Sequence, residues 1–467
     1  MKALTLEQVT YACKGRYFGS VKDQEQTITQ VTTDSRKAGR NCLFIPLKGT
    51  RADGHDYIES VVLGGAICLT EKKLTQAEEP YILVDSTYQA LKDLAQYYLT
   101  QLSIKVVGII GSVGKTSTKE MVASVLEQKY KVLKTAGNFN NEVGLPLTVF
   151  RIEEEHEVAV LEMGISEFQE MTRLARIANP DYVVMTNIGA CHLENLIDLD
   201  GVLKAKSEVF DVVTKPLQAV VNGDDAKLRT LEGTKAGTPI YFCKDQKSAG
   251  LLKEQGIANE RLYLADGIES RDAYSINATL HIPDEEISVT IPIPGEHNVA
   301  NALAAAAIGK QLGLTKEEIK AGIESVQTIS GRSNFVKAGA VTIIDDCYNA
   351  NPMSMKASLD VLSNMPGRKI AVLGDMGELG SQEKQLHREV GEHAAEKSID
   401  ALFVCGELSK EIAKGAAGIA KIASYDKLDE MIEELKCYLE DGDTVLVKAS
   451  HFMEYPKVVE AIEKAFG

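Results

Sequence analysis

The segment that most constrains the fold is a glycine-rich turn between an apolar stretch and an amphipathic one. Residues 104–110 are Ile-Lys-Val-Val-Gly-Ile-Ile, which is typical of a buried strand, and the turn that follows is Gly-Ser-Val-Gly-Lys-Thr-Ser-Thr. The amphipathic segment after the turn, residues 119–128, predicts a helix. A strand, a glycine turn and a helix in this order indicate an α/β fold with a parallel sheet.

The residues of this turn are suited to holding phosphate groups. Glycines let backbone N–H groups come close to phosphate oxygens, and the N-terminus of the following helix attracts anions. Lys115 can reach the β- and γ-phosphates of a nucleotide, and the hydroxyl of Thr116 can ligate Mg²⁺. The longer pattern Gly-x-x-x-x-Gly-Lys-Thr would need glycine at Ile109, so this is the shorter Gly-x-x-Gly-Lys-Thr form. We predict a phosphate site; the alternative is an ordinary turn between a strand and a helix.

The composition argues against several classes of protein. The 51 Lys and Arg residues against 67 Asp and Glu residues give a net charge of −16, so a broad basic face for nucleic acid is not expected. The longest apolar runs, such as residues 302–308, are far shorter than the roughly 20 residues that a membrane-spanning helix needs. The first residues show no secretory signal, and we expect a cytoplasmic protein. The eight cysteines form no Cys-x-x-Cys pair, which favours buried, reduced thiols.

The 467 residues are enough for about three domains. Short β-branched runs alternate with helical patterns, which indicates parallel sheets covered by helices, and we place the domains at residues 1–102, 103–316 and 317–467. The alanine-rich helix expected at residues 298–312 ends at Gly313, a typical C-terminal signal. The expected strands are residues 42–47, 66–70, 81–85, 104–110, 131–135, 158–162, 182–187, 218–222, 341–346, 369–374, 401–405 and 444–448, with further β structure at 274–293.

Two strands of the middle domain lead to side chains that could bind a metal ion. Glu162 ends the strand at residues 158–162, and His192 follows the strand at residues 182–187. Open α/β sheets hold ligands at the carboxyl ends of their strands, which makes Glu162 a candidate Mg²⁺ ligand. Taken alone, the spacing favours a surface or capping residue at His192 over a metal ligand, and it favours a solvated helix face for Lys206.

Together these residues resemble the ATP-dependent Mur ligases, which build the peptide of peptidoglycan and form one group with the folylpolyglutamate synthases. The similarity covers almost the whole chain. The Gly-x-x-Gly-Lys-Thr pattern of the family is met at residues 111–116, its metal-binding glutamate at Glu162, and its Asn-Ile-x-x-x-His at residues 187–192. Its Ala-Lys-x-x-x-Phe lysine is Lys206, and Pro-Gly-Glu-His-Asn at residues 294–298 resembles the start of the adenine-contacting helix.

The resemblance implies a central P-loop parallel-sheet ATPase domain flanked by a smaller N-terminal α/β domain and a C-terminal Rossmann-like α/β domain. It also implies that ATP and Mg²⁺ are bound. The ATP contacts would be Gly111, Ser112, Val113, Gly114, Lys115, Thr116, Ser117, Asn298, Arg332 and Asp346. The metal ligands would be Thr116, Glu162, His192 and Lys206, the last as a carbamate formed with CO₂. The catalytic residues would be Lys115, Glu162, His192 and Lys206.

Other motifs resemble the family member that adds D-alanyl-D-alanine to UDP-N-acetylmuramoyl-tripeptide. They are Asp-Asp-Cys-Tyr-Asn-Ala-Asn-Pro at residues 345–352, Asn-Phe-Asn-Asn-Glu-Val-Gly at 138–144 and Gly-Asp-Met-Gly-Glu-Leu-Gly at 374–380. A further motif, Thr-Asp-Ser-Arg at residues 33–36, resembles the family's module that binds the uridine nucleotide. The substrate-binding residues implied are Ser35, Arg36, Asn138, Asn140, Asn141, Asn349 and Asn351. The reaction implied passes through an acyl phosphate. We expect a monomer whose C-terminal domain closes over ATP and the incoming dipeptide, with no nucleic acid or membrane partner.

Several alternatives remain open. Asp345-Asp346 could cap a helix, Arg332 could be a surface charge, and Ser35-Arg36 could be turn residues. The chain departs from the family at Asn41-Cys42, where Gly-Asp is expected, and at residues 448–451, Lys-Ala-Ser-His instead of Lys-Gly-Ser-Arg. A folylpolyglutamate synthase-like ligase is a rival, although that enzyme has no UDP-binding domain ahead of the loop. A nucleotide-dependent switch is a rival of another class, and its guanine-reading Asn-Lys-x-Asp motif is absent.

Overall fold

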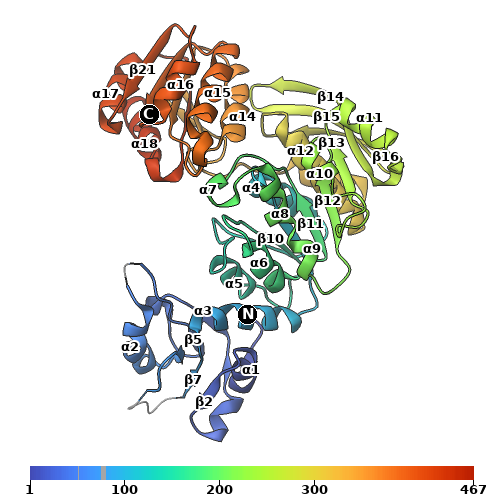
Figure 1. Cartoon of the computed structure of the whole chain (residues 1–467), viewed down its shortest axis with the longest axis vertical. Coiled ribbons are helices and arrows are strands. Elements are labelled where there is room, and N and C mark those ends of the chain that lie inside the picture. The colour runs from blue at the N-terminus through green and yellow to red at the C-terminus, as the bar shows by residue number, and fades with distance from the viewer. Residues whose placement is uncertain (51, 75–79) are drawn as a thin grey trace.

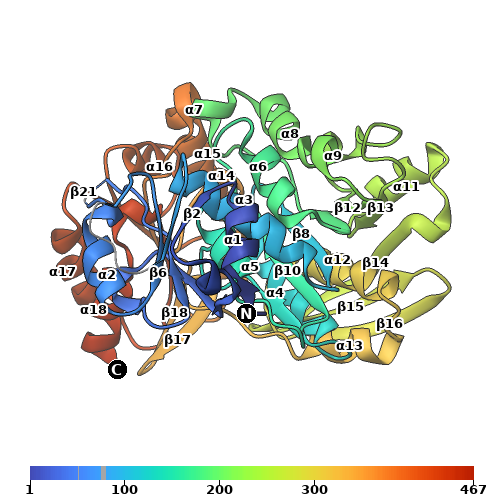
Figure 2. The ribbon, with the colours of Figure 1, turned by 90° about the horizontal axis from the view of Figure 1, so that it is seen from below.

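The computed structural model describes residues 1–50, 52–74 and 80–467. The described residues form three α/β domains that follow one another along the long axis of the molecule, with the N-terminal domain at one end and the C-terminal domain at the other (Figure 1). Figure 2 looks along the molecule from the side of the N-terminal domain. The expected three-domain α/β fold is therefore confirmed.

The N-terminal domain contains a mainly parallel sheet. Its strands are β1 (Leu4–Thr5), β2 (Arg16–Phe18), β3 (Thr27–Ile28), β4 (Gln30–Thr32), β5 (Cys42–Phe44), β6 (Ile67–Thr70) and β7 (Tyr81–Leu83), and its helices are α1 (Leu6–Ala12), α2 (Ile58–Leu63) and α3 (Thr87–Thr100). The five-stranded sheet has the order β2-β7-β6-β5-β4, with β2 antiparallel, while β1 and β3 form a separate pair. Helix α3 leads into the central domain and packs against two of its helices.

The central domain contains the largest sheet. Its strands are β8 (Lys105–Ile110), β9 (Val132–Lys134), β10 (Val158–Glu162), β11 (Tyr182–Met185), β12 (Gln218–Asn222), β13 (Ile240–Cys243), β14 (Leu262–Asp272), β15 (Ser275–Ile282) and β16 (Glu285–Ile291). Its helices are α4 (Lys115–Leu126), α5 (Gly144–Val149), α6 (Glu170–Ala178), α7 (Leu193–Leu196), α8 (Leu199–Ser207), α9 (Val209–Val212), α10 (Ala226–Arg229), α11 (Gln246–Glu254), α12 (His297–Gln311) and α13 (Lys316–Glu324). The sheet order is β16-β15-β14-β13-β12-β11-β8-β10-β9.

The order of these strands places the candidate residues together. Strand β8 pairs in parallel with β10 on one side and with β11 on the other, so the glycine loop, Glu162 and the segment leading to His192 leave the same edge of the sheet. Helix α12 packs against α4, and its buried alanines allow a close approach. Gly313, with φ +76°, follows this helix, as the sequence predicts.

The C-terminal domain has a six-stranded sheet. Its strands are β17 (Asn334–Ala338), β18 (Val341–Asp345), β19 (Lys369–Gly374), β20 (Ala401–Cys405), β21 (Lys421–Tyr425) and β22 (Thr444–Lys448), and its helices are α14 (Pro352–Ser363), α15 (Glu383–Glu396), α16 (Ser409–Gly415), α17 (Leu428–Tyr438) and α18 (Pro456–Phe466). The order is β17-β18-β22-β19-β20-β21, and only β17 is antiparallel to its neighbour.

Some expectations need correction. The helix after the glycine loop begins at Lys115 rather than at residue 119, because Gly114, with φ +78°, turns the chain directly into the helix. The sequence analysis did not predict β1 to β4, β13, β14, β17 or β21. Seven of the eight cysteines are buried, as expected, but Cys437 on α17 is exposed. No helix in the described part of the chain is both long and apolar enough to cross a bilayer.

Candidate active site

A pocket of about 670 Å³ lies between the central and C-terminal domains. Its wall includes the carboxyl ends of β10 and β11 and the N-terminus of α4, together with the loop that follows β18. Most of the predicted site residues line this pocket: Ser112, Val113, Gly114, Lys115, Thr116, Ser117, Asn140, Asn141, Glu162, His192, Arg332, Asp346, Asn349 and Asn351.

The other predicted residues lie outside the pocket wall. The amide of Asn298 donates to the carbonyl of Pro294 (2.8 Å), whereas its neighbours His297 and Asn301 do line the pocket. Asn138 is exposed on the loop before α5. Ser35 and Arg36 lie in the N-terminal domain, where the guanidinium of Arg36 pairs with Asp34 at 2.8 Å. The remaining two, Gly111 and Lys206, are also absent from the pocket wall.

The glycine loop is held in a fixed conformation by its neighbours. Gly111 has φ +148°, and a Cβ at this position would collide with the hydroxyl of Thr186. The N–H of Val113 donates to Oδ1 of Asn187 (2.9 Å), and the Asn187 amide donates to the carbonyl of Val113 (3.0 Å). Lys115 Nζ donates to the carbonyl of Gly111 at 2.9 Å, so its ammonium lies over the loop. The loop is therefore preorganised, and Asn187 is one of the residues that hold it.

Glu162 is a buried carboxylate at the pocket wall. It is 1% exposed, and its two oxygens accept hydrogen bonds from the hydroxyl of Thr116 and the amide of Asn140, both at 2.8 Å. Within the described residues Glu162 forms no ion pair, and no three His, Cys, Asp or Glu side chains gather into a group that could hold a metal ion by themselves. A buried carboxylate beside oxygen donors, with no cationic partner, fits a divalent cation.

His192 and Lys206 differ in their exposure and partners. His192 precedes α7 with φ +52°, and its Nδ1 lies 2.6 Å from Oε2 of Glu378 in the C-terminal domain. Lys206 is 2% exposed and forms no hydrogen bond or ion pair with any other described side chain. Burial is the main reason that the pKa of the Lys206 ammonium falls to about 8; Cys191 opposes this shift, and the charge of Lys115 contributes to it.

The C-terminal side of the pocket is built around Asp346. Its carboxylate accepts from Lys448 Nζ (2.6 Å), the Ser358 hydroxyl (2.5 Å) and the N–H of Ser333 (3.1 Å). The guanidinium of Arg332 stacks on the ring of Tyr348, 3.9 Å from its centroid. The carboxylate of Asp346 is thus already hydrogen-bonded to three protein groups, and it holds this side of the pocket in place.

The sequence analysis missed several residues that line the pocket. Lys448 was noted only as part of a departing motif, and Asp224, Asp225 and Lys244 were not considered. Asp225 accepts from the N–H of Ile188 at 2.6 Å. The run Asn-Gly-Asp-Asp, which begins at the last residue of β12, was the signal, because it marks a further strand end at the same edge of the sheet.

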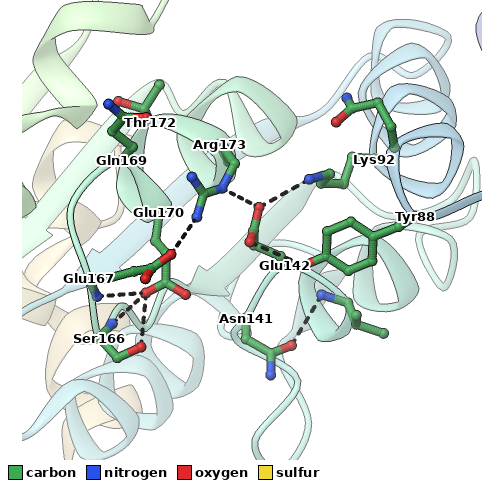
Figure 3. A network of polar contacts seen from close by, with 12 residues as sticks. Tyr88, Lys92, Asn141, Glu142, Ser166, Glu167, Gln169, Glu170, Thr172 and Arg173 are labelled. Atoms are coloured by element: carbon green, nitrogen blue, oxygen red, sulfur yellow. Dashed lines mark hydrogen bonds and ion pairs between the residues drawn. The ribbon is translucent and has the colours of Figure 1, made fainter. Parts of the chain in front are cut away.

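Glu142, which follows the pocket-lining residue Asn141, joins helices α3 and α6. Figure 3 shows its carboxylate between Lys92 of α3 and Arg173 of α6, at 3.2 Å and 2.5 Å, with the Tyr88 hydroxyl donating from a third direction. Arg173 also pairs with Glu167, in a loop whose neighbouring residues line the pocket. The N-terminal domain is therefore tied by charge to the loops around the site.

Comparison with known proteins gives matches along the chain. Residues 109–309 match the Mur ligase middle domain, residues 331–451 the glutamate ligase domain of Mur ligases, and residues 27–99 the catalytic domain of the Mur ligase family. A Bacillus subtilis protein named UDP-N-acetylmuramoyl-tripeptide–D-alanyl-D-alanine ligase is 37% identical over 93% of this chain and 93% of its own length. The chain belongs to the Mur ligase family.

Solved Mur ligase structures show the same arrangement. The crystal structure of MurF from Acinetobacter baumannii has a TM-score of 0.86 and 31% identity, and 99% of each chain is covered. The structure of MurF ligase from Thermotoga maritima in complex with ADP has a TM-score of 0.82 and 30% identity, over 94% of this chain and 97% of that one. The family resemblance of the sequence motifs is thus confirmed over nearly the entire chain.

Proposed function

We propose that this Mur ligase uses ATP to join D-alanyl-D-alanine to UDP-N-acetylmuramoyl-tripeptide. The observation that carries this proposal is the similarity to two relatives named UDP-N-acetylmuramoyl-tripeptide–D-alanyl-D-alanine ligase. The Bacillus subtilis protein is 37% identical over 93% of this chain, and the Escherichia coli protein is 34% identical over 99%. The likeness includes the N-terminal domain, which a ligase of the folylpolyglutamate type lacks. Product formation would also separate the chain from a nucleotide-dependent switch.

ATP would lie in the pocket with its phosphates on residues 111–117. The left-handed glycines, the ammonium of Lys115 and the N-terminus of α4 support this placement. Glu162, the Thr116 hydroxyl and His192 would hold Mg²⁺, which supplies positive charge opposite the phosphate oxygens. Arg332 would reach the phosphates of ATP, and the α12 region around Asn298 would contact the adenine.

The chemistry requires a carboxylate to be activated. At neutral pH the terminal carboxylate of the tripeptide has no usable leaving group, so one of its oxygens attacks the γ-phosphorus of ATP and releases ADP. The amine of D-alanyl-D-alanine then attacks the acyl carbon, loses a proton, and displaces phosphate from the tetrahedral intermediate. Lys115 and Arg332 offset the charge of the transferred group, and the C-terminal domain excludes water from the acyl phosphate.

Lys206 would act as a carbamate. Its neutral amine attacks CO₂, a C–N bond forms, and one proton is released, which converts a cation into an anion near the metal ligands. Its burial, its lowered pKa and the absence of an acceptor among the described side chains support this role. An ordinary buried lysine would pair with a carboxylate instead.

Each domain would hold one part of the reaction. The N-terminal domain, residues 1–102, would bind the UDP-sugar through Ser35 and Arg36, and residues 103–316 would bind ATP. Residues 317–467 would close over ATP and bind the dipeptide near Asn349 and Asn351, which line the pocket. Asn138, Asn140 and Asn141 would contact the peptide.

One assay tests the function. The chain is incubated with ATP, Mg²⁺, D-alanyl-D-alanine and, separately, UDP-tripeptides that end in lysine or in diaminopimelate, and phosphate release and product mass are followed. One phosphate should be released for each amide formed with at least one tripeptide. ATP hydrolysis without a product of the expected mass would contradict the proposal.

A further inference from the structure

His192 faces a residue that only the C-terminal domain supplies. Its Nδ1 lies 2.6 Å from Oε2 of Glu378, in the loop between β19 and the short 3₁₀ helix η5 (Gly380–Gln382). Figure 1 shows α7, which begins directly after His192, beside the C-terminal domain. The pair therefore links a side chain of the candidate metal site to a separate domain.

The two segments around this pair pack against each other. A Cβ added at Gly380 would lie 3.4 Å from the backbone nitrogen of Glu194, so the backbones of η5 and α7 are close. Leu193 and Leu379, the residues that follow His192 and Glu378, are 6% and 1% exposed. The contact between His192 and Glu378 is thus part of a packed interface.

Hydrogen bonds hold the loop that carries Glu378. The N–H of Met376 donates to Nε2 of the buried His387 (2.8 Å), and the N–H of Gly377 donates to the hydroxyl of Ser450 (2.9 Å). Glu378 has φ +63° and His192 has φ +52°, left-handed conformations that residues other than glycine keep where the surrounding structure requires them. Both side chains are therefore aimed by a constrained backbone.

A histidine that ligates a metal ion commonly has its second ring nitrogen bound by a carboxylate or a carbonyl, which fixes the ring and its tautomer. We propose that Glu378 is the positioning residue of His192: it binds Nδ1 and leaves Nε2 as the nitrogen for a divalent cation. The cation site then reaches its full affinity only while the C-terminal domain lies against α7. This inference rests on the proposed function, in which His192 is a metal ligand.

The test measures Mn²⁺ binding to the full chain in the presence of ADP, through the electron paramagnetic resonance signal of unbound Mn²⁺. Glu378→Gln keeps the size of the side chain and removes its charge, and it should raise the Kd for Mn²⁺ about tenfold or more. Glu194→Gln makes the same charge change at an exposed position of α7 and should leave the Kd within about twofold. In a His192→Asn background, Glu378→Gln should have no further effect.

The same variants distinguish the positioning role of Glu378 from the proposed role of His192 as a metal ligand. In turnover assays Glu378→Gln should raise the Mg²⁺ concentration for half-maximal rate and leave the KM for D-alanyl-D-alanine unchanged. A normal Kd in Glu378→Gln with a raised Kd in His192→Asn would overturn the positioning role alone. A normal Kd in both variants would overturn this inference together with the metal role of His192. An equal loss with and without His192 would show that Glu378 acts elsewhere, and would also overturn it.

Discussion

Arg332 is held at the pocket by an aromatic ring. Its guanidinium carbon lies 3.9 Å from the ring centroid of Tyr348, and it forms no ion pair with the other described residues. Tyr348→Leu removes this contact, which is worth about 1 kcal/mol, and should raise the KM for ATP roughly fivefold. Tyr348→Phe keeps the ring and should behave as the unmodified chain in the same steady-state assay. Equal effects of both substitutions would mean that the hydroxyl, not the ring, matters.

Lys206 provides a second test at this scale. With a pKa of about 8, about a quarter of its amine is neutral at pH 7.5, against about a thousandth for an ordinary lysine, and the neutral fraction rises with pH. A ¹³C spectrum recorded with ¹³C-bicarbonate should therefore show a carbamate resonance that disappears in Lys206→Arg. A spectrum without this resonance at saturating bicarbonate would contradict the assignment.

Single residues could be predicted where the pattern is local. Lys115 and Thr116 follow the end of strand β8 and Glu162 ends strand β10, so their place at the carboxyl edge of a parallel sheet follows from the sequence. Lys448 could not be predicted, because its partner Asp346 lies 102 positions away and the pair forms only after the sheet is assembled. The roles of the predicted residues toward ligands stay predictions.

At the scale of elements, most strands with strong apolar patterns were predictable, but the buried inner strand β13 and both edge strands of the C-terminal sheet were missed. Strands β8 and β10 lie inside the central sheet and are almost wholly buried, so their β-branched runs stand out. Strand β21 is an edge strand whose residues are half-buried or exposed, and β17 is the opposite edge of the same sheet. Their sequences resemble loops, and pairing with a neighbouring strand decides their structure.

The ion pairs of Glu142 with Lys92 of α3 and Arg173 of α6 should contribute to the stability of the folded chain. Glu142→Gln leaves Lys92 and Arg173 without their shared counter-charge, and Lys92 is only 7% exposed. We expect a loss of about 3 kcal/mol in the free energy of unfolding, measured by urea denaturation. Glu155→Gln removes an exposed partner of Lys131 and should cause no measurable change. Similar stability of the two variants would argue against these ion pairs as a link between domains.

At the scale of the whole molecule, one pocket draws its wall from two domains, while the predicted uridine site lies in a third. Such a division favours movement of the domains upon binding. Small-angle scattering should show a smaller radius of gyration when a non-hydrolysable ATP analogue and UDP-tripeptide are both present than with either alone. The forward scattering also reports the mass, which we expect to be that of a monomer. Unchanged dimensions would contradict closure.

The thiols of this chain offer a simple way to watch that movement. Cys437 lies exposed on α17 of the C-terminal domain, while the other seven cysteines are buried. A maleimide dye should therefore attach at one native position, on the domain that is expected to move. Fluorescence anisotropy or energy transfer to a labelled nucleotide could then follow single catalytic cycles without any engineered residue.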